Sequence, residues 1–352
     1  MAEALRLAEL GLWTTDPNPR VGCVISIDGR VIGRGWHRAA GEPHAEALAL
    51  REAGEQARGA TVYVTLEPCS HTGRTPPCAD ALVEAGVGEV VVAMRDPNPQ
   101  VAGQGLERLR GAGINVRCGL MEAGARELNI GFVSRHERGR PWLRAKLACS
   151  LDGFTAGPDG RSQWITGPSA RVDGQHWRAR ASAIVSGIGT VLADDPRLNV
   201  RLSDVQRQPQ RVIMDSQARL PRTARLLAGS DPIIVATTVP APWQHDQVRW
   251  RQLPATGAGR VDPAALMTLL TELECNEVHV EAGPALSGAL LGAGLVDELL
   301  LYQAPVLLGD GAPLLSLAGM EKFDQRLHLS LFEQRRIGAD QRLRLRPSPA
   351  FI

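Results

Sequence analysis

The residues best suited to chemistry lie in two segments, PHAEA at 43–47 and TLEPCSHTGRTPPC at 65–78. A catalytic zinc ion takes three protein ligands and leaves one position for water. His44, Cys69 and Cys78 offer one nitrogen and two sulfurs, which make up such a set. Zinc lowers the pKa of its bound water towards about 7, which makes hydroxide available near neutral pH. The two segments therefore predict a hydrolytic zinc site.

Glu46 stands two residues after His44. At this position it is better placed to carry a proton than to act as a fourth metal ligand. A carboxylate beside the water can take its proton and pass it to a departing amine. His-x-Glu followed by Pro-Cys is the signature of zinc nucleobase deaminases, with the glutamate as acid and base. Pro68-Cys69 continues this pattern, but eight residues instead of two separate Cys69 from Cys78.

The insert SHTGRTPP at 70–77 must loop out before the second cysteine. Its two prolines suit the start of a helix, and this places Cys78 at the positive helix end, which stabilises a thiolate. His71, inside the insert, is a rival metal ligand. The alternative to a metal site is that these residues are only two buried cysteines and a surface histidine. Their combination with Glu46 argues against this alternative.

These residues must be positioned by a first half that alternates strand and helix patterns. Asp28-Gly29 between two β-rich runs is a strong hairpin signal. The expected strands are 21–27, 30–37, 60–66, 89–94 and 114–119, the last three buried, and the expected helices are 2–12, 44–54, 78–86 and 104–112. The pattern predicts a sheet with helices on both faces, a three-layer α/β/α domain.

The charged segment 135–141 contains Gly and Pro and has no periodicity, which favours a domain boundary after residue 140. The second half begins a new α/β series. Its expected strands are 142–150, 182–187, 211–214, 232–237, 277–281 and 297–304, its expected helices are 168–180, 262–274 and 284–293, and 240–262 is expected to be irregular. We therefore expect two α/β domains, 1–140 and 141–352.

Chemical signals in the second half are weaker. No Gly-x-Gly-x-x-Gly follows a strand, so the dinucleotide fingerprint is absent. In VHVEAGPALSGALL at 278–291, a strand ends at Glu281 and turns at Gly283-Pro284 into a helix whose free N–H groups could receive a phosphate. A plain strand–turn–helix is the alternative reading of this segment.

With TDPNPRVGCVI at 15–25 and DPNPQVAGQG at 96–105, the cysteine segment 65–78 resembles the deaminase domain of the bifunctional riboflavin-biosynthesis deaminase–reductase family. Ordinary cytidine deaminases have the short cysteine spacing, so the insert is specific to this family. The resemblance implies a cytidine-deaminase-like domain that hydrolyses the 2-amino group from a diaminopyrimidinone carrying ribosylamino 5-phosphate. It also implies that Asn18 lines the pyrimidine pocket, with a simple turn residue as the alternative.

Four further segments resemble the reductase half of the same family, which has a dihydrofolate-reductase-like fold. They are KLACSLDGFTA at 146–156, SQWITG at 162–167, GTVLADDPRLNVR at 189–201 and VIMDSQ at 212–217. The resemblance implies that NADPH reduces the ribose carbon after its ring opens, which yields a ribitylamino product. The hydride chemistry belongs to the cofactor, and the protein supplies orientation.

The resemblance also assigns site residues in this half. The cofactor positions are Ala148, Trp164, Thr190, Asp194, Ser216, Gly283, Pro284, Ala285, Leu286, Ser287, Gly288 and Ala289. The substrate positions are Ser162, Arg178, Leu198, Arg201 and Glu281. Arg178 and Arg201 suit phosphate because guanidinium offers bidentate donors, with surface charge as the alternative. A core position is the alternative for Trp164, and Lys146 lies on a strand near the expected site.

Composition limits the classes of function. The chain has 39 basic and 38 acidic residues and a net charge of +1, which gives no long-range attraction to nucleic acid or membranes. No apolar run reaches the roughly 20 residues of a membrane span, and the start does not resemble a signal peptide. Six cysteines are too few for a disulfide scaffold and indicate a cytoplasmic protein. The expected partner is the phosphorylated pyrimidine, in a homo-oligomer that is a dimer or a tetramer.

Two other functions stay open at this stage. The second half could be a scaffold or a degenerate reductase, although its arginines and its Glu-Ala-Gly-Pro turn are present. A zinc-stabilised binding protein is the other possibility. A structural zinc would want four protein ligands and no acid or base. Three clear ligands with Glu46 beside them argue against it.

Overall fold

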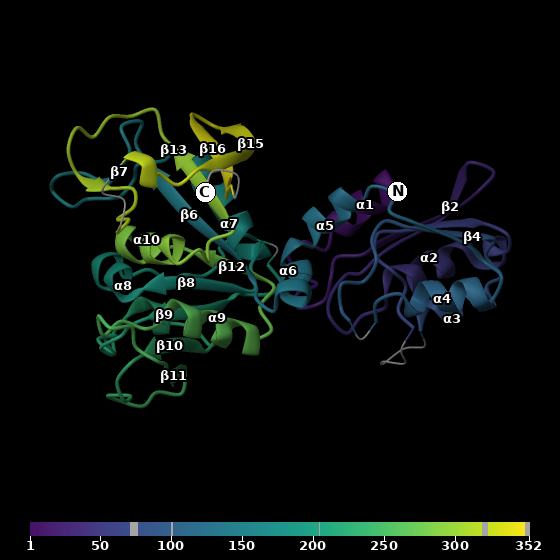
Figure 1. The fold of residues 1–352 in the computed structure, drawn as a ribbon, viewed down its shortest axis with the longest axis horizontal. Coiled ribbons are helices and arrows are strands. Elements are labelled where there is room, and N and C mark those ends of the chain that lie inside the picture. Colours follow the sequence, from purple (N-terminus) through teal and green to yellow (C-terminus); the bar gives the residue numbers. More distant parts are fainter. Residues whose placement is uncertain (71–76, 100, 204, 319–322, 349–352) are drawn as a thin grey trace. The chain divides into compact units, whose positions relative to one another are not determined.

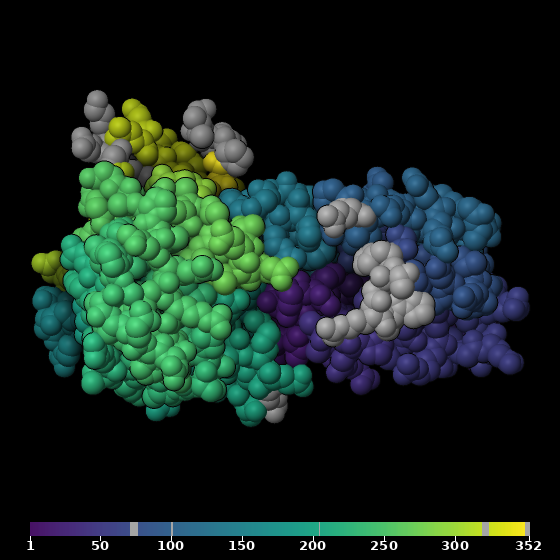
Figure 2. All heavy atoms as spheres, turned by 90° about the horizontal axis from the view of Figure 1, so that it is seen from below, coloured from purple at the N-terminus to yellow at the C-terminus, as the bar shows by residue number. Residues whose placement is uncertain are grey.

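The computed structural model describes residues 1–70, 77–99, 101–203, 205–318 and 323–348. The chain divides into two compact units, Met1–Arg140 and Pro141–Ile352. The first unit is coloured purple to blue and the second teal to yellow in Figure 1 and in the space-filling view of Figure 2. In the described part of the chain, no helix has the length and apolar character that a membrane crossing requires.

The first unit is a three-layer α/β/α structure. Its helices are α1 (Ala2–Glu9), α2 (Ala45–Ala53), the 3-10 turn η1 (Gly54–Ala57), α3 (Cys78–Glu84), α4 (Gln104–Gly111), α5 (Glu122–Leu128) and α6 (Ile130–Arg138). Its strands are β1 (Gly22–Ile27), β2 (Arg30–Trp36), β3 (Thr61–Val64), β4 (Glu89–Val92) and β5 (Asn115–Cys118). The sheet order is β2-β1-β3-β4-β5, parallel from β3 to β5 and antiparallel on both sides of β1.

Helices cover both faces of this sheet, as expected (Figure 1). The apolar sides of α2, α3 and α4 share one core with the sheet, and those of α1 and α5 share another with its opposite face. Helix α2 lies very close to β2, since a Cβ at Gly35 would be 2.0 Å from the carbonyl oxygen of Ala45. This close approach fixes the start of α2, where His44 is the N-cap residue.

The Asp28-Gly29 hairpin is confirmed. Asp28 has φ of 50° and Gly29 has φ of 77°, so both central residues are left-handed, as a tight hairpin between twisted strands requires. One other expectation for this unit was wrong. β5 is an exposed edge strand and not a buried one. The charged segment that starts at residue 135 continues α6 as far as Arg138, and the helix ends at Gly139, whose φ is 68°.

The second unit is built on a nine-stranded sheet. Its main strands are β6 (Trp142–Cys149), β8 (Ala183–Gly187), β9 (Gln210–Met214), β10 (Ile233–Thr237), β11 (Val248–Gln252), β12 (Glu277–Val280), β13 (Glu298–Gln303), β15 (Leu329–Ile337) and β16 (Asp340–Pro347). A small pair consists of β7 (Phe154–Ala156) and β14 (Ala312–Pro313). The helices are α7 (Pro168–Arg180), α8 (Ile188–Asp194), α9 (Pro263–Glu272) and α10 (Pro284–Gly292), with the 3-10 turns η2 (Arg225–Leu227) and η3 (Phe323–Gln325).

The sheet order is β11-β10-β9-β8-β12-β6-β13-β16-β15. The seven strands from β11 to β13 are parallel, and β16 and β15 continue the sheet antiparallel. Helices α9 and α10 share a core with one face, while α7 and α8 pack on the other. Strands β10 and β12 are buried along their whole length, as expected of central strands covered on both faces.

Two parts of this unit differ from expectation. The stretch 240–262 contains β11, an edge strand whose sequence VRWRQ alternates with two arginines and therefore lacks an apolar run. The hairpin β15–β16 at the other edge was not expected at all. β15 is mostly exposed, so its sequence does not show the alternation of a half-buried strand.

Candidate active sites

The structure brings His44, Cys69 and Cys78 together. Their ligand atoms lie within 4.8 Å of one another. His44 Nδ1 is 3.5 Å from Cys69 Sγ and 3.3 Å from Cys78 Sγ. His44 stands before α2, Cys69 follows β3, and Cys78 is the first residue of α3. One imidazole nitrogen and two sulfurs are a donor set that fits zinc.

Glu46 lies in the first turn of α2 and is 3% exposed. Burial raises the pKa of its carboxyl to about 7, while the nearby His44 acts in the opposite direction. A carboxyl group with this pKa can both accept and release a proton near neutral pH. The structure therefore places a proton carrier beside the three candidate ligands.

Cys69 and Cys78 influence each other's ionisation. The hydrogen bond between the thiols lowers the pKa of Cys69 and raises the pKa of Cys78. The backbone N–H of Cys78 also donates to Cys69 Sγ at 3.3 Å. The amide at the start of α3 thus stabilises a thiolate on Cys69.

Asn18 is connected to this cluster by His37, a histidine that the sequence analysis did not identify. Asn18 Nδ2 is 3.1 Å from Nε2 of His37, whose Nδ1 is 3.2 Å from the carbonyl oxygen of Pro43. The ring of His37 meets that of His44 edge-on, with centroids 5.5 Å apart. Asn18 is also a turn residue, since its N–H donates to the carbonyl of Thr15. The rival ligand, His71, lies outside the described residues.

In the second unit, four of the assigned residues lie at one edge of the sheet. Ser216 follows β9, Thr190 lies in the helix after β8, Glu281 follows β12, and Ala148 is near the end of β6. These four strands are neighbours and parallel, so their carboxyl ends share an edge. Ligands of open α/β sheets bind outside this edge.

Arg178 and Glu281 form the central ion pair of this edge. Arg178, from α7, donates through Nε and Nη2 to the two carboxylate oxygens at 2.5 and 2.7 Å, and through Nη1 to the carbonyl of Asn199 at 2.9 Å. The Arg178 guanidinium offsets the effect of burial and holds the pKa of Glu281 well below its usual range. Because Arg178 already uses these donors, a bidentate grip on phosphate would break its pair with Glu281.

Arg201 is the more accessible cation. It is exposed, and its guanidinium has one long hydrogen bond, 3.4 Å, to Asn199. Burial and the neighbouring charge of Arg178 lower the pKa of Arg201, so the two guanidinium groups lie near each other. Burial likewise lowers the pKa of Lys146, which faces the charges of Glu281 and Arg178. Lys146 therefore belongs to the same cluster.

His279, on β12, was also missed from the sequence. Its side chain is fully buried, and its Nε2 is 3.3 Å from Glu281 Oε1. Leu198 is 2% exposed and packs in the core, with φ of 50°. Its contact with a ligand would therefore come from its backbone.

The turn into α10 offers exposed backbone at Gly283 and Ala285. Two other assigned residues of this helix face the protein. Ser287 is 1% exposed and donates to the carbonyl of Ala282. Gly288 permits a close contact, since a Cβ there would lie 1.9 Å from the carbonyl oxygen of Ser316.

The remaining assigned residues are more scattered. Trp164 is 68% exposed, which excludes the alternative of a core residue, and Arg171 lies over its ring at 4.6 Å. Asp194 is exposed at the end of α8, and Ser162 is half-buried. Among the described residues, no hydrogen bond or ion pair links Trp164 or Asp194 to the Arg178–Glu281 pair.

Family models match both units. The cytidine and deoxycytidylate deaminase zinc-binding region matches residues 1–94, and the RibD C-terminal domain matches residues 141–343. Both expected folds are therefore confirmed, a cytidine-deaminase-like domain followed by a dihydrofolate-reductase-like one.

Full-length relatives match the chain from end to end. The riboflavin biosynthesis protein RibD of Escherichia coli is 50% identical, with 98% of both chains covered. The solved structure of Acinetobacter baumannii RibD has a TM-score of 0.90 at 46% identity, covering 99% of this chain and 97% of that one. A Thermotoga maritima diaminohydroxyphosphoribosylaminopyrimidine deaminase/5-amino-6-(5-phosphoribosylamino)uracil reductase has a TM-score of 0.90 at 33% identity, with the same coverage.

Proposed function

The chain belongs to the RibD family and is a bifunctional deaminase and reductase of riboflavin biosynthesis, and on this premise we propose the substrates, cofactors and residues of its two reactions. The first substrate is the diaminohydroxyphosphoribosylaminopyrimidine named for the Thermotoga relative. Water replaces its 2-amino group, and ammonia leaves. The second reaction reduces the ribosyl group of 5-amino-6-(5-phosphoribosylamino)uracil to ribityl.

The first unit, residues 1–140, carries the deamination. One observation supports this most strongly: the ligand atoms of His44, Cys69 and Cys78 lie within 4.8 Å, with buried Glu46 in the adjoining turn. A single zinc ion held by these three residues supplies Lewis acidity that makes a water molecule reactive near neutral pH. Glu46 takes a proton from the attacking water and delivers it to the departing amine. Asn18, oriented by His37, contacts the pyrimidine.

The second unit, residues 141–352, carries the reduction. NADPH supplies the hydride, and the protein supplies orientation. The cofactor is held by the exposed backbone at the start of α10, by Ala148 near the end of β6, and by the residues after β8 and β9. Glu281, fixed by Arg178, contacts the substrate sugar, and Arg201 contacts its phosphate. We assign the phosphate to Arg201 and not to Arg178, because the Arg178 guanidinium already donates to Glu281 and Asn199.

The reactions and the cysteines agree with a cytoplasmic enzyme. Six cysteines in 352 residues are too few for a disulfide scaffold, which supports this location. The partner is a small phosphorylated pyrimidine, and the net charge of +1 gives no attraction to nucleic acid. We expect the active form to be a homo-oligomer, which sedimentation would test.

The first experiment incubates zinc-loaded protein with the diaminopyrimidine substrate and follows products by mass, without and with NADPH. Exchange of the amine for oxygen should occur without NADPH, and addition of two hydrogens only with it. NADH at the same concentration tests the preference for the phosphorylated cofactor.

The outcomes separate the two halves of the proposal. If exchange occurs without any NADPH-dependent reduction, the cofactor assignment to residues 141–352 is wrong. If zinc-loaded protein leaves the substrate unchanged, the substrate itself is wrong for this chain.

A further inference from the structure

Glu67 is a buried acid that neither reaction uses. It follows β3, stands two residues before Cys69, and is 3% exposed. Among the described residues it has no basic partner in an ion pair. A buried carboxylate without compensation is costly, so its hydrogen bonds must account for its position.

Four backbone N–H groups donate to the Glu67 carboxylate. Oε2 accepts from Asp96 at 3.1 Å and from Gly103 at 2.9 Å. Oε1 accepts from Gly105 at 2.9 Å and from Leu106 at 3.3 Å. Three of these donors belong to the N-cap and first turn of α4, where free N–H groups and the helix dipole favour an anion.

The segment that carries these donors is shaped to meet Glu67. Gly103 has φ of 86°, a left-handed conformation that glycine adopts without strain. A Cβ at Gly105 would lie 2.0 Å from the carbonyl oxygen of Pro68. The start of α4 is therefore in direct contact with the residue that joins Glu67 to the ligand Cys69.

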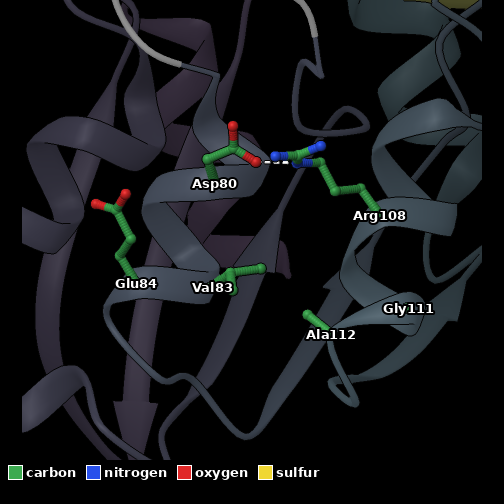
Figure 3. Close-up of a pocket in the computed structure, with 6 residues that line it drawn as sticks. All are labelled: Asp80, Val83, Glu84, Arg108, Gly111 and Ala112. Carbon is green, nitrogen blue, oxygen red and sulfur yellow. Dashed lines mark hydrogen bonds and ion pairs between the residues drawn. The ribbon is translucent and has the colours of Figure 1, made fainter.

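Helix α3 holds the other side of the same ligand. The N–H of Ala79 donates to the carbonyl of Cys69 at 3.1 Å, and the N–H of Cys78 donates to its Sγ. Asp80 of α3 points across a surface hollow to Arg108 of α4, with which it forms an ion pair (Figure 3). Cys69 is thus held between two helices that are themselves joined.

We propose that Glu67 is a positioning residue for Cys69, and that its carboxylate fixes the Pro68–Cys69 turn against the start of α4. The inference rests on the proposed zinc site. Groups that orient metal ligands from the second layer affect metal affinity and metal geometry without touching the metal.

The test compares metal binding by wild type and Glu67→Gln. Glutamine keeps the size of Glu67, but in either orientation its NH2 group faces two N–H donors. We expect a thiol chelator to remove zinc or cobalt about 10–100-fold faster, the range typical of second-layer changes. We also expect a shifted sulfur-to-cobalt charge-transfer band at a temperature where circular dichroism shows both proteins folded.

The matched control is Glu89→Gln. Glu89 lies on β4 of the same sheet and pairs with Arg117 at the surface, so its loss removes a carboxylate and an ion pair away from the ligands. Its cobalt spectrum and release rate should equal those of wild type. NADPH-dependent reduction of the deaminated intermediate should be unchanged in both variants.

A second variant covers the case in which Glu67→Gln does not fold. Gly105→Ala keeps the Glu67 charge and displaces Pro68 through the added Cβ, and we expect the same spectral shift and faster release. Wild-type spectrum and release rate in a folded Glu67→Gln protein would overturn the positioning role and leave the zinc proposal intact. A wild-type protein that binds neither metal would overturn both.

Discussion

Among single residues, a substitution of Glu46 should distinguish metal binding from catalysis. Glu46→Gln should retain zinc, because the three candidate ligands are untouched, and should lower the deamination rate by about 10²–10⁴-fold, the usual contribution of acid–base catalysis. Metal analysis and ammonia release measure the two effects. Glu84→Gln, at an exposed position on α3, is the control. Near-normal ammonia release from Glu46→Gln would show that another group carries the proton.

Arg178 tests the second site. Arg178→Lys keeps the charge but loses the two-pronged contact with Glu281, and charge-assisted hydrogen bonds contribute about 1.5–3 kcal/mol each. The kcat/KM of reduction should therefore fall by about 10–100-fold, while deamination stays unchanged. NADPH oxidation with the deaminated intermediate gives the first quantity. The exposed Arg249→Lys on β11 is expected to match wild type, and equal loss in both variants would refute the role.

The convergence of the candidate zinc ligands could be predicted from the sequence, because residue type and local spacing carry that signal. His37, Glu67 and His279 could not. Each is a buried polar side chain, and the partners of His37 and Glu67 are distant in the chain, so only the folded structure reveals these contacts. His279 contacts the nearby Glu281, but its burial does not show in the sequence. The roles of the assigned reductase residues stay predictions that the Arg178 experiment begins to test.

At the scale of elements, Glu298 joins three strands. It starts β13, is fully buried, and pairs with Arg144 of β6 and Arg344 of β16. Burial alone would raise the pKa of Glu298, but these guanidinium groups bring it down to about 2. Its ionised form therefore stabilises the fold fully above its unfolded pKa of 4.5, and this contribution is lost as the pH falls from 4.5 towards 2.

Glu298→Gln should lower the free energy of unfolding by about 3–5 kcal/mol at neutral pH, the usual cost of breaking a buried ion pair. Arg144 would keep its pair with Glu277, and Arg344 its pair with Glu333. The difference in Tm from wild type should narrow as the pH falls from about 4.5 towards 2, the window in which the Glu298 charge loses its stabilising effect. Thermal melts across this range measure it. Glu272→Gln, at an exposed position of α9, should follow wild type throughout. A pH-independent difference would contradict the ionic role.

Element prediction succeeded where burial produces a pattern. The central strand β10 is a continuous apolar or β-branched segment, and α7 was expected at its observed bounds. It failed at sheet edges, because an exposed strand such as β11 or β15 needs no apolar face. Its identity as a strand comes from the neighbour that it pairs with.

At the scale of the whole molecule, the two compact units predict two separable responses to metal. Removal of zinc by a chelator should abolish deamination and leave NADPH-dependent reduction of the supplied intermediate intact. Calorimetry should show that added zinc raises the temperature of one unfolding transition, since a ligand stabilises the unit that binds it. Loss of both activities on chelation, with restoration by zinc, would contradict this independence.

The two sites also differ in the length of sequence over which their residues are spread. The three zinc ligands fall between His44 and Cys78, whereas the assigned reductase residues run from Ala148 to Ala289. A protease nick between Cys78 and Arg140 leaves every zinc ligand on one fragment. A nick almost anywhere between β6 and α10 divides the reductase residues between two pieces, which must stay associated for that activity to survive.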